Sequence, residues 1–142
     1  MDPRETVLSI MRASALNAYL LTSVNHIPRA RIVAPVIDDD FTLWIITFSN
    51  SRKVEDILNN PVVTVTFNEY PSKGVREVQY FGRAELVKEQ ADRQRLWEAK
   101  KDSIGGYFKD TADPDYALVK IRPNFIEWSI RPQSTKEILR FT

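Results

Sequence analysis

Residues 29–58 read RARIVAPVIDDDFTLWIITFSNSRKVEDIL, and the fold prediction starts from this stretch. In residues 29–37 the even-numbered positions are all apolar, while arginine occupies the first two odd-numbered ones. Such alternation is typical of a β-strand. Three aspartates at 38–40 form a polar turn, and residues 41–48 form the next strand. Ser49-Asn50-Ser51 then breaks the strand and can cap a helix. The stretch therefore predicts a strand, a turn, a second strand and a helix.

Helices are predicted at three places in the chain. Asp2, Pro3 and Glu5 form a helix start with an acidic N-cap and proline at the first position. The helix after Ser51 has a predicted buried face and ends before Pro61. A third helix is predicted over residues 89–101. The predicted buried residues of the first two are Val7, Ile10 and Met11, and Val54, Ile57 and Leu58.

Strands account for most of the remaining chain. Gly82 marks a bulge or a close backbone approach within one long strand. Many short strands joined by turns favour an antiparallel barrel that closes on itself, because closure removes exposed edges. The sequence predicts a mainly β protein, a β-barrel with flanking helices, forming one domain over residues 1–142. The further strands are predicted at residues 18–24, 62–68, 75–87, 116–121 and 125–130.

Composition excludes several classes of function. The formal net charge of +1 argues against binding to nucleic acid or membrane by bulk electrostatics. The chain has no cysteine and one histidine, His26, so no metal site is expected. No segment has the apolar length needed to span a bilayer, and a cytoplasmic location is expected.

Ser51-Arg52-Lys53 is the local pattern that points to a ligand. A helix N-terminus is electrically positive, so two cations in its first turn are unfavourable unless an anion binds there. Phosphate is the usual ligand of such a helix end. If residues 29–37 and 41–48 pair as a hairpin, Arg31 lies opposite Thr47 and adds a guanidinium. The alternative is an exposed charged pair, with Glu55 and Asp56 offsetting Arg52 and Lys53.

These residues also resemble a known family. Arg31-Ile32-Val33-Ala34, Ile46-Thr47 and Ser51-Arg52-Lys53 resemble the FMN-binding signature of the pyridoxamine 5′-phosphate oxidase-like split barrels. The whole chain is most similar to their general stress protein branch. The supporting stretches are Asn60-Pro61, Phe81-Gly82-Arg83-Ala84-Glu85, Leu96-Trp97, Asp113-Pro114-Asp115-Tyr116 and Ile126-Glu127-Trp128.

The resemblance implies a six-stranded antiparallel split barrel that forms a homodimer with FMN at the subunit interface. Trp128 matches a tryptophan that approaches the flavin from the other subunit, although it also fits a core or interface aromatic. Glu77 stands where the family has a flavin-contacting glutamine. The implied cofactor-binding residues are Arg31, Ile32, Val33, Ala34, Ile46, Thr47, Ser51, Arg52, Lys53, Glu77 and Trp128.

Departures from the family pattern bear on the reaction. Val36 replaces a lysine that touches substrate in the true oxidase, and Arg95 and Ala99 replace a tyrosine and an arginine, so pyridoxine 5′-phosphate oxidation is not expected. One hypothesis is an FMN-dependent oxidoreductase acting on a small molecule with electrons from a nicotinamide donor. The other is a flavin-binding module for storage or stress sensing. A deazaflavin in place of FMN stays open. Catalytic residues are not assigned.

Overall fold

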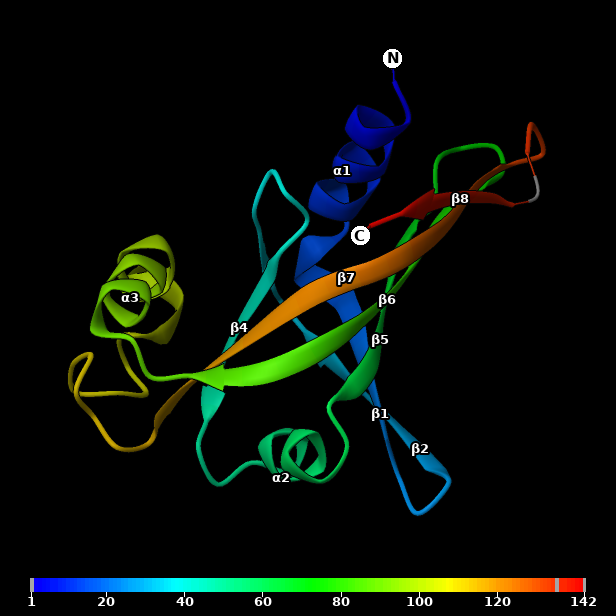
Figure 1. The fold of residues 1–142 in the computed structure, drawn as a ribbon. Helices are drawn as coiled ribbons and strands as arrows, with labels where there is room; N and C mark the ends of the chain where they lie inside the picture. Colours follow the sequence, from blue (N-terminus) through cyan, green and yellow to red (C-terminus); the bar gives the residue numbers. More distant parts are fainter. Residues whose placement is uncertain (1, 135, 142) are drawn as a thin grey trace.

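The structure is a computed structural model that describes residues 2–134 and 136–141. One antiparallel sheet has the strand order β2-β1-β5-β6-β7-β4-β3, with β8 paired to β7 (Figure 1). The elements are α1 (Pro3–Ala13), the short 3-10 helix η1 (Ala15–Asn17), β1 (Ala18–Val24), β2 (Ile27–Val33), β3 (Val36–Ile37), β4 (Leu43–Phe48), α2 (Arg52–Asn59), β5 (Val62–Glu69), β6 (Val75–Val87), α3 (Gln90–Ile104), β7 (Tyr116–Arg131) and β8 (Glu137–Arg140).

A single bent strand closes the sheet into a barrel. Only Ala34 and Pro35 separate β2 from β3, yet β2 pairs with β1 at one end of the strand order and β3 pairs with β4 at the other. Proline suits this bend because it has no N–H to leave unpaired. With β2 and β3 counted as one strand and β8 left aside, the described residues form a barrel of six strands, and the predicted mainly β barrel with flanking helices is confirmed.

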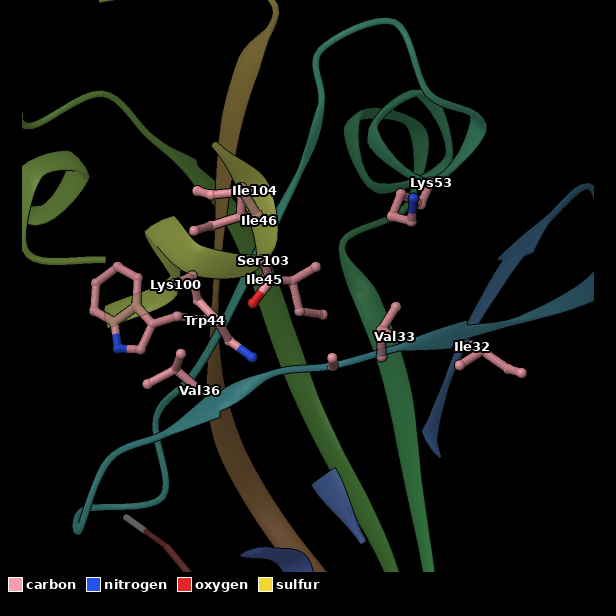
Figure 2. Close-up of a pocket in the computed structure, with 11 residues that line it drawn as sticks. Ile32, Val33, Val36, Trp44, Ile45, Ile46, Lys53, Lys100, Ser103 and Ile104 are labelled. Carbon is pink, nitrogen blue, oxygen red and sulfur yellow. The ribbon is translucent and has the colours of Figure 1, made fainter. Parts of the chain in front are cut away.

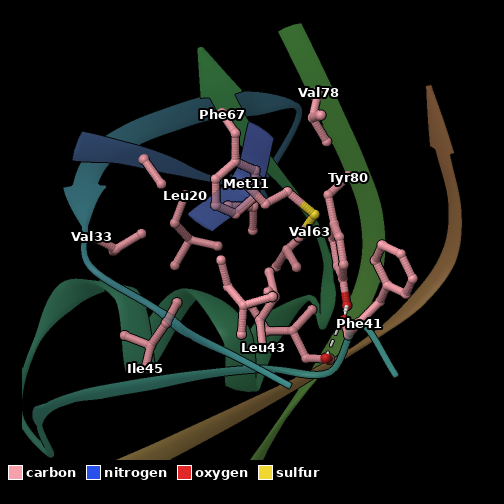
Figure 3. Packing of buried hydrophobic residues seen from close by; sticks show 14 of the residues in the cluster. Met11, Leu20, Val33, Phe41, Leu43, Ile45, Val63, Phe67, Val78 and Tyr80 are labelled. Atoms are coloured by element: carbon pink, nitrogen blue, oxygen red, sulfur yellow. Dashed lines mark hydrogen bonds between the residues drawn. The ribbon is translucent and has the colours of Figure 1, made fainter. Parts of the chain in front are cut away.

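Helices close the two ends of the barrel (Figure 1). At one end α1 inserts Val7, Ile10 and Met11 into the main core, as the sequence predicted. At the opposite end α2 contributes Ile57 to the same core. Figure 3 shows Tyr80 within this core, where its hydroxyl lies 2.7 Å from the carbonyl oxygen of Phe41. The third helix, α3, flanks the barrel and packs through Leu96 into a separate cluster.

The predicted irregularity at Gly82 is confirmed. The register between β6 and β7 shifts between Phe81 and Gly82. A Cβ atom on Gly82 would lie 2.5 Å from the carbonyl oxygen of Arg122, which leaves no room for a side chain. The same shift explains a wrong prediction: residues 116–121 and 125–130 belong to one continuous strand, β7, because the bulge takes up one extra residue, Asn124, and the pairing continues through Pro123.

One element was not predicted and one further prediction is wrong. The sequence analysis did not predict the short strand β8. On α2, Leu58 is 69% exposed, and the helix instead buries the carboxylate of Asp56. Asp56 takes this place because it has polar partners inside the barrel end, which are described below.

Candidate functional site

A cleft of about 240 Å³ opens between the bent strand β2–β3, β4, α2 and α3 (Figure 2). Apolar side chains from the strands form most of its surface. Lys53 reaches it from α2, while Lys100 and Ser103 reach it from α3. The sequence analysis did not identify Lys100 as a site residue, because it lies in a helix that is polar on most sides and no adjacent motif distinguishes it from the other polar residues. The lining residues are Ile32, Val33, Ala34, Val36, Trp44, Ile45, Ile46, Lys53, Lys100, Ser103 and Ile104.

The N-terminus of α2 lies beside this cleft. Ser51 occupies the N-cap position, as predicted, but its hydroxyl makes no capping hydrogen bond to the helix. Lys53 Nζ donates a hydrogen bond to Thr47 Oγ1 at 2.8 Å, and Thr47 Oγ1 donates one to Ser51 Oγ at 3.4 Å. Three predicted site residues, Thr47, Ser51 and Lys53, are therefore brought together at one helix end.

The charge of Lys53 is not balanced locally. Burial, together with the positive charge of Arg31, lowers the pKa of Lys53 below the ordinary lysine value. Within the described residues no carboxylate lies at ion-pair distance from its amine, whose hydrogen-bond partner is a neutral hydroxyl. A half-buried ammonium group next to a positive helix end is a place where an anion is stabilised.

Arg52 behaves differently from its neighbour. Its side chain is 63% exposed, and its Nε atom lies 4.0 Å from Glu55 Oε2. This contact resembles the exposed charged pair considered from the sequence. The alternative interpretation, an exposed charge offset by a neighbouring carboxylate, thus holds for Arg52, whereas the side chain of Lys53 turns toward the cleft.

Arg31 reaches α2 by a route other than the predicted hairpin. Of residues 29–37, Val36 and Ile37 are the two that pair with β4, and Arg31 is paired with Leu20 of β1, so the expected pairing of Arg31 with Thr47 is wrong. The bend at residues 34–35 separates β2 from β4. The arginine instead points inward and contacts α2: its Nη2 atom lies 2.9 Å from Asp56 Oδ2. Its charge still acts on Lys53.

Asp56 is a second residue at this site, besides Lys100, that the sequence analysis did not identify as functional. Its carboxylate is 1% exposed and pairs with Arg29 as well as Arg31. The alternation in this strand pointed the other way, because apolar Ile32 is exposed while Arg29 and Arg31 share the odd-numbered face with buried Val33. Two arginines on an inward face require a buried anion.

Glu77 and Trp128 lie elsewhere in the single chain. They line a second, polar pocket of about 190 Å³ on β6 and β7, which shares no residue with the cleft. Glu77 Oε1 lies 3.8 Å from Arg131 Nη2, and Trp128 packs against the main core. Ser129 lines the same pocket, and its buried hydroxyl has no hydrogen-bond partner in the described part of the chain. Within one chain, the predicted cofactor-binding residues therefore lie in two separate places.

A sequence model of the pyridoxamine 5′-phosphate oxidase family matches residues 12–127, which is most of the chain. This chain belongs to that family. The family resemblance predicted from the sequence is confirmed. No curated protein sequence matches the chain.

Solved structures of the same family fold cover nearly the whole chain. General Stress Protein 26 from Bacillus anthracis is 25% identical, with a TM-score of 0.80 over 99% of this chain and 100% of its own. A pyridoxamine 5′-phosphate oxidase-related, FMN binding protein from Nostoc punctiforme is 13% identical, with a TM-score of 0.69 over 100% and 98%. A heme binding protein from Mycobacterium smegmatis is 12% identical, with a TM-score of 0.78 over 99% and 59%. The last two show likeness of fold alone.

Among the described residues, no helix combines the length and the apolar character needed to cross a membrane.

Proposed function

We propose that the cleft beside α2 binds FMN and that the protein is a flavin-dependent oxidoreductase acting on a small molecule. The observation that carries the proposal is Lys53, a half-buried cation without a carboxylate partner among the described residues, at a helix N-terminus whose N-cap hydroxyl caps nothing. A phosphate monoester has the charge and the acceptor oxygens that this arrangement lacks.

The donor set and the cleft surface suit the two halves of FMN. Thr47, Ser51 and Lys53 offer hydroxyl and ammonium donors for a phosphate, with Arg31 adding positive charge nearby. Val33 and Ile46 belong to an apolar surface against which a flat ring system can pack. Arg52, which is exposed, can turn from its long contact with Glu55 toward a bound anion.

Haem fits this cleft less well. An axial ligand to haem iron comes from histidine, cysteine, methionine or tyrosine. None of the residues lining the cleft is of these types, and His26 lies exposed in the turn between β1 and β2. A deazaflavin with a phosphate would suit the same donors, so the cofactor must be identified chemically.

A homodimer would complete the site. The cleft of about 240 Å³ is smaller than the roughly 300–1,000 Å³ of pockets that enclose a ligand. On the outer face of the barrel, one row of side chains crosses the strands from the cleft to the second pocket, each residue being the register partner of the next. Phe81 stacks on Phe125 beside this row. The row is Ile32, Tyr19, Thr66, Gln79, Glu127 and Ile138.

Three of these residues, Ile32, Tyr19 and Ile138, are exposed apolar side chains. A two-fold interface is self-complementary, so pairing this face with its copy can set the second pocket of one subunit against the cleft of the other. Glu77 and Trp128 would then approach the flavin from the partner subunit. Sedimentation equilibrium with and without FMN tests this assembly.

FMN supplies the hydride and electron chemistry, and the chain supplies binding and position. Lys53 holds the phosphate, and the apolar side chains of β2–β4 exclude water from one side of the ring. Val36 offers no charge to a substrate at its position, which argues against a phosphorylated pyridoxine substrate. Storage or sensing of flavin is the competing function, and steady-state oxidation of NADH or NADPH by the loaded protein with an electron acceptor separates the two.

The direct test is the visible absorption spectrum of the purified protein, followed by FMN titration of the stripped protein. Mass spectrometry of the ligand released on denaturation distinguishes FMN, a deazaflavin and haem. The proposal predicts a flavin spectrum and release of FMN. A folded protein that is colourless and ignores added FMN would contradict it.

A further inference from the structure

Asp56 forms the centre of a buried polar cluster at the α2 end of the barrel. Arg29 Nη1 lies 2.7 Å from its Oδ1 atom, and Arg31 Nη2 lies 2.9 Å from its Oδ2 atom. Thr22 Oγ1 donates a hydrogen bond to the same Oδ2 at 2.7 Å and accepts one from Arg31 Nη1 at 2.7 Å. Arg31 is thus fixed at both of its terminal nitrogens.

The cluster holds more positive than negative charge. Two guanidinium groups share one carboxylate, which leaves a net charge of +1. Burial alone would raise the pKa of Asp56, but hydrogen bonds from Thr22 and Arg31 and the charges of both arginines outweigh it and hold that pKa below its usual range. Asp56 is therefore ionised at neutral pH, and its single negative charge neutralises only half of the arginine charge.

Helix geometry couples this cluster to the phosphate donors. Asp56 follows Lys53 by three residues, a spacing that places both on one side of α2. The same helix therefore carries Lys53 and the anchor of Arg31. Without the anchor, Arg29 and Arg31 would repel each other as neighbours on one strand face, and Arg31 could turn toward solvent.

We infer that Asp56 is a positioning residue for the cofactor phosphate, which holds the Arg31 guanidinium beside Lys53 at the N-terminus of α2. This inference rests on the proposed FMN site. It assigns to Asp56 an effect on FMN affinity that passes through Arg31 alone. A carboxylate with a merely structural role would affect stability and would not depend on Arg31 in this way.

A double-mutant cycle separates these roles. The proteins are the wild type, Asp56→Asn, Arg31→Met and the double variant, and the measurement is the dissociation constant for FMN from flavin fluorescence. We expect each single change to weaken FMN binding about tenfold or more, and the double variant to bind within about threefold of Arg31→Met. Losses that multiply, or an Asp56→Asn protein with wild-type affinity, would overturn the inference.

Loss of one partner from a buried ion pair is strongly destabilising, so Asp56→Asn requires a second background. Arg29→Met removes the extra arginine and leaves the pair between Asp56 and Arg31 intact. Comparing Arg29→Met with Arg29→Met/Asp56→Asn should again show about tenfold weaker FMN binding. Equal affinities overturn the inference alone, whereas a wild-type protein that binds no FMN overturns the proposed function as well.

Discussion

The two ends of the barrel are closed by helices of opposite character. At the α1 end the seal is apolar, made by Val7, Ile10 and Met11 in the main core. At the α2 end Ile57 provides an apolar contact, but Asp56 is buried beside it and pairs with two arginines of β2. The α1 end is a purely apolar seal, while the α2 end buries charged groups at positions where apolar side chains would need no ionic partners.

This difference separates stability from function. Burying charges costs free energy that even good ion pairs recover only in part. Lys53, half-buried without a carboxylate within reach in the described structure, adds to that cost. Groups held in such unfavourable surroundings are typical of binding sites, where the ligand provides the missing partner.

The largest expected effect is on the apolar end. Ile10→Ala should lower the free energy of unfolding by about 2–5 kcal/mol, because it removes a fully buried side chain and leaves a cavity. Urea denaturation of the FMN-free protein measures this loss. In the folded variant the FMN dissociation constant should stay within about twofold of wild type, since the two ends are distant and separable. A large loss of FMN affinity would show that the ends are coupled.

At the polar end we expect Lys53→Met to lower FMN affinity without lowering stability, the opposite of Ile10→Ala. Loss of one charge-assisted contact of about 1.5–3 kcal/mol should weaken FMN binding roughly ten- to hundredfold. The free energy of unfolding without FMN should stay at or above the wild-type value, because an uncompensated, half-buried charge is removed. FMN titration and urea denaturation on the same samples give both numbers.

Lys101→Met is the matched control for Lys53→Met. It also removes one lysine charge, but Lys101 is exposed on α3 and pairs with Glu98 at 3.0 Å. Its FMN affinity should equal that of the wild type within about twofold. Equal losses in the two variants would mean that net charge, and not the position of Lys53, governs binding.

A smaller effect is expected from pH. Since the pKa of Lys53 in the free protein lies below the ordinary value of 10.5, its proton is lost earlier on alkaline titration than that of an exposed lysine. A bound phosphate favours the protonated form, so FMN affinity should fall, by up to about tenfold per pH unit, as pH rises through the lowered pKa. The FMN-free protein should gain stability over the same range, because its unfolded state then binds more protons. The alkaline fall attributable to Lys53 should vanish in Lys53→Met.

The apolar α1 end of the barrel was easier to predict from the sequence than the polar α2 end. Helical spacing predicted the buried residues of α1, and a glycine inside a long strand predicted the irregularity at Gly82. The start of α2 was predicted from the capping residue Ser51, and the dipole argument predicted an anion at the two cations that follow it. The partner of Arg31 was not, because local patterns cannot show that a strand bends at residues 34–35 and leaves β4. Asp56 was considered only as a helical neighbour that could offset Arg52 and Lys53, because its actual partners lie more than twenty residues away in the sequence.

The smallest effect is expected at Leu58, whose burial was predicted wrongly from its hydrophobic character. Leu58 was predicted to be buried and is 69% exposed, whereas its neighbour Ile57 is 3% exposed. Leu58→Ala should change the free energy of unfolding by no more than about 0.5 kcal/mol, as surface substitutions generally do. Ile57→Ala should lower it by about 2–5 kcal/mol. If the two losses in urea denaturation were equal, α2 would be rotated from the orientation that buries Asp56, and the polar seal at this end of the barrel would be wrong with it.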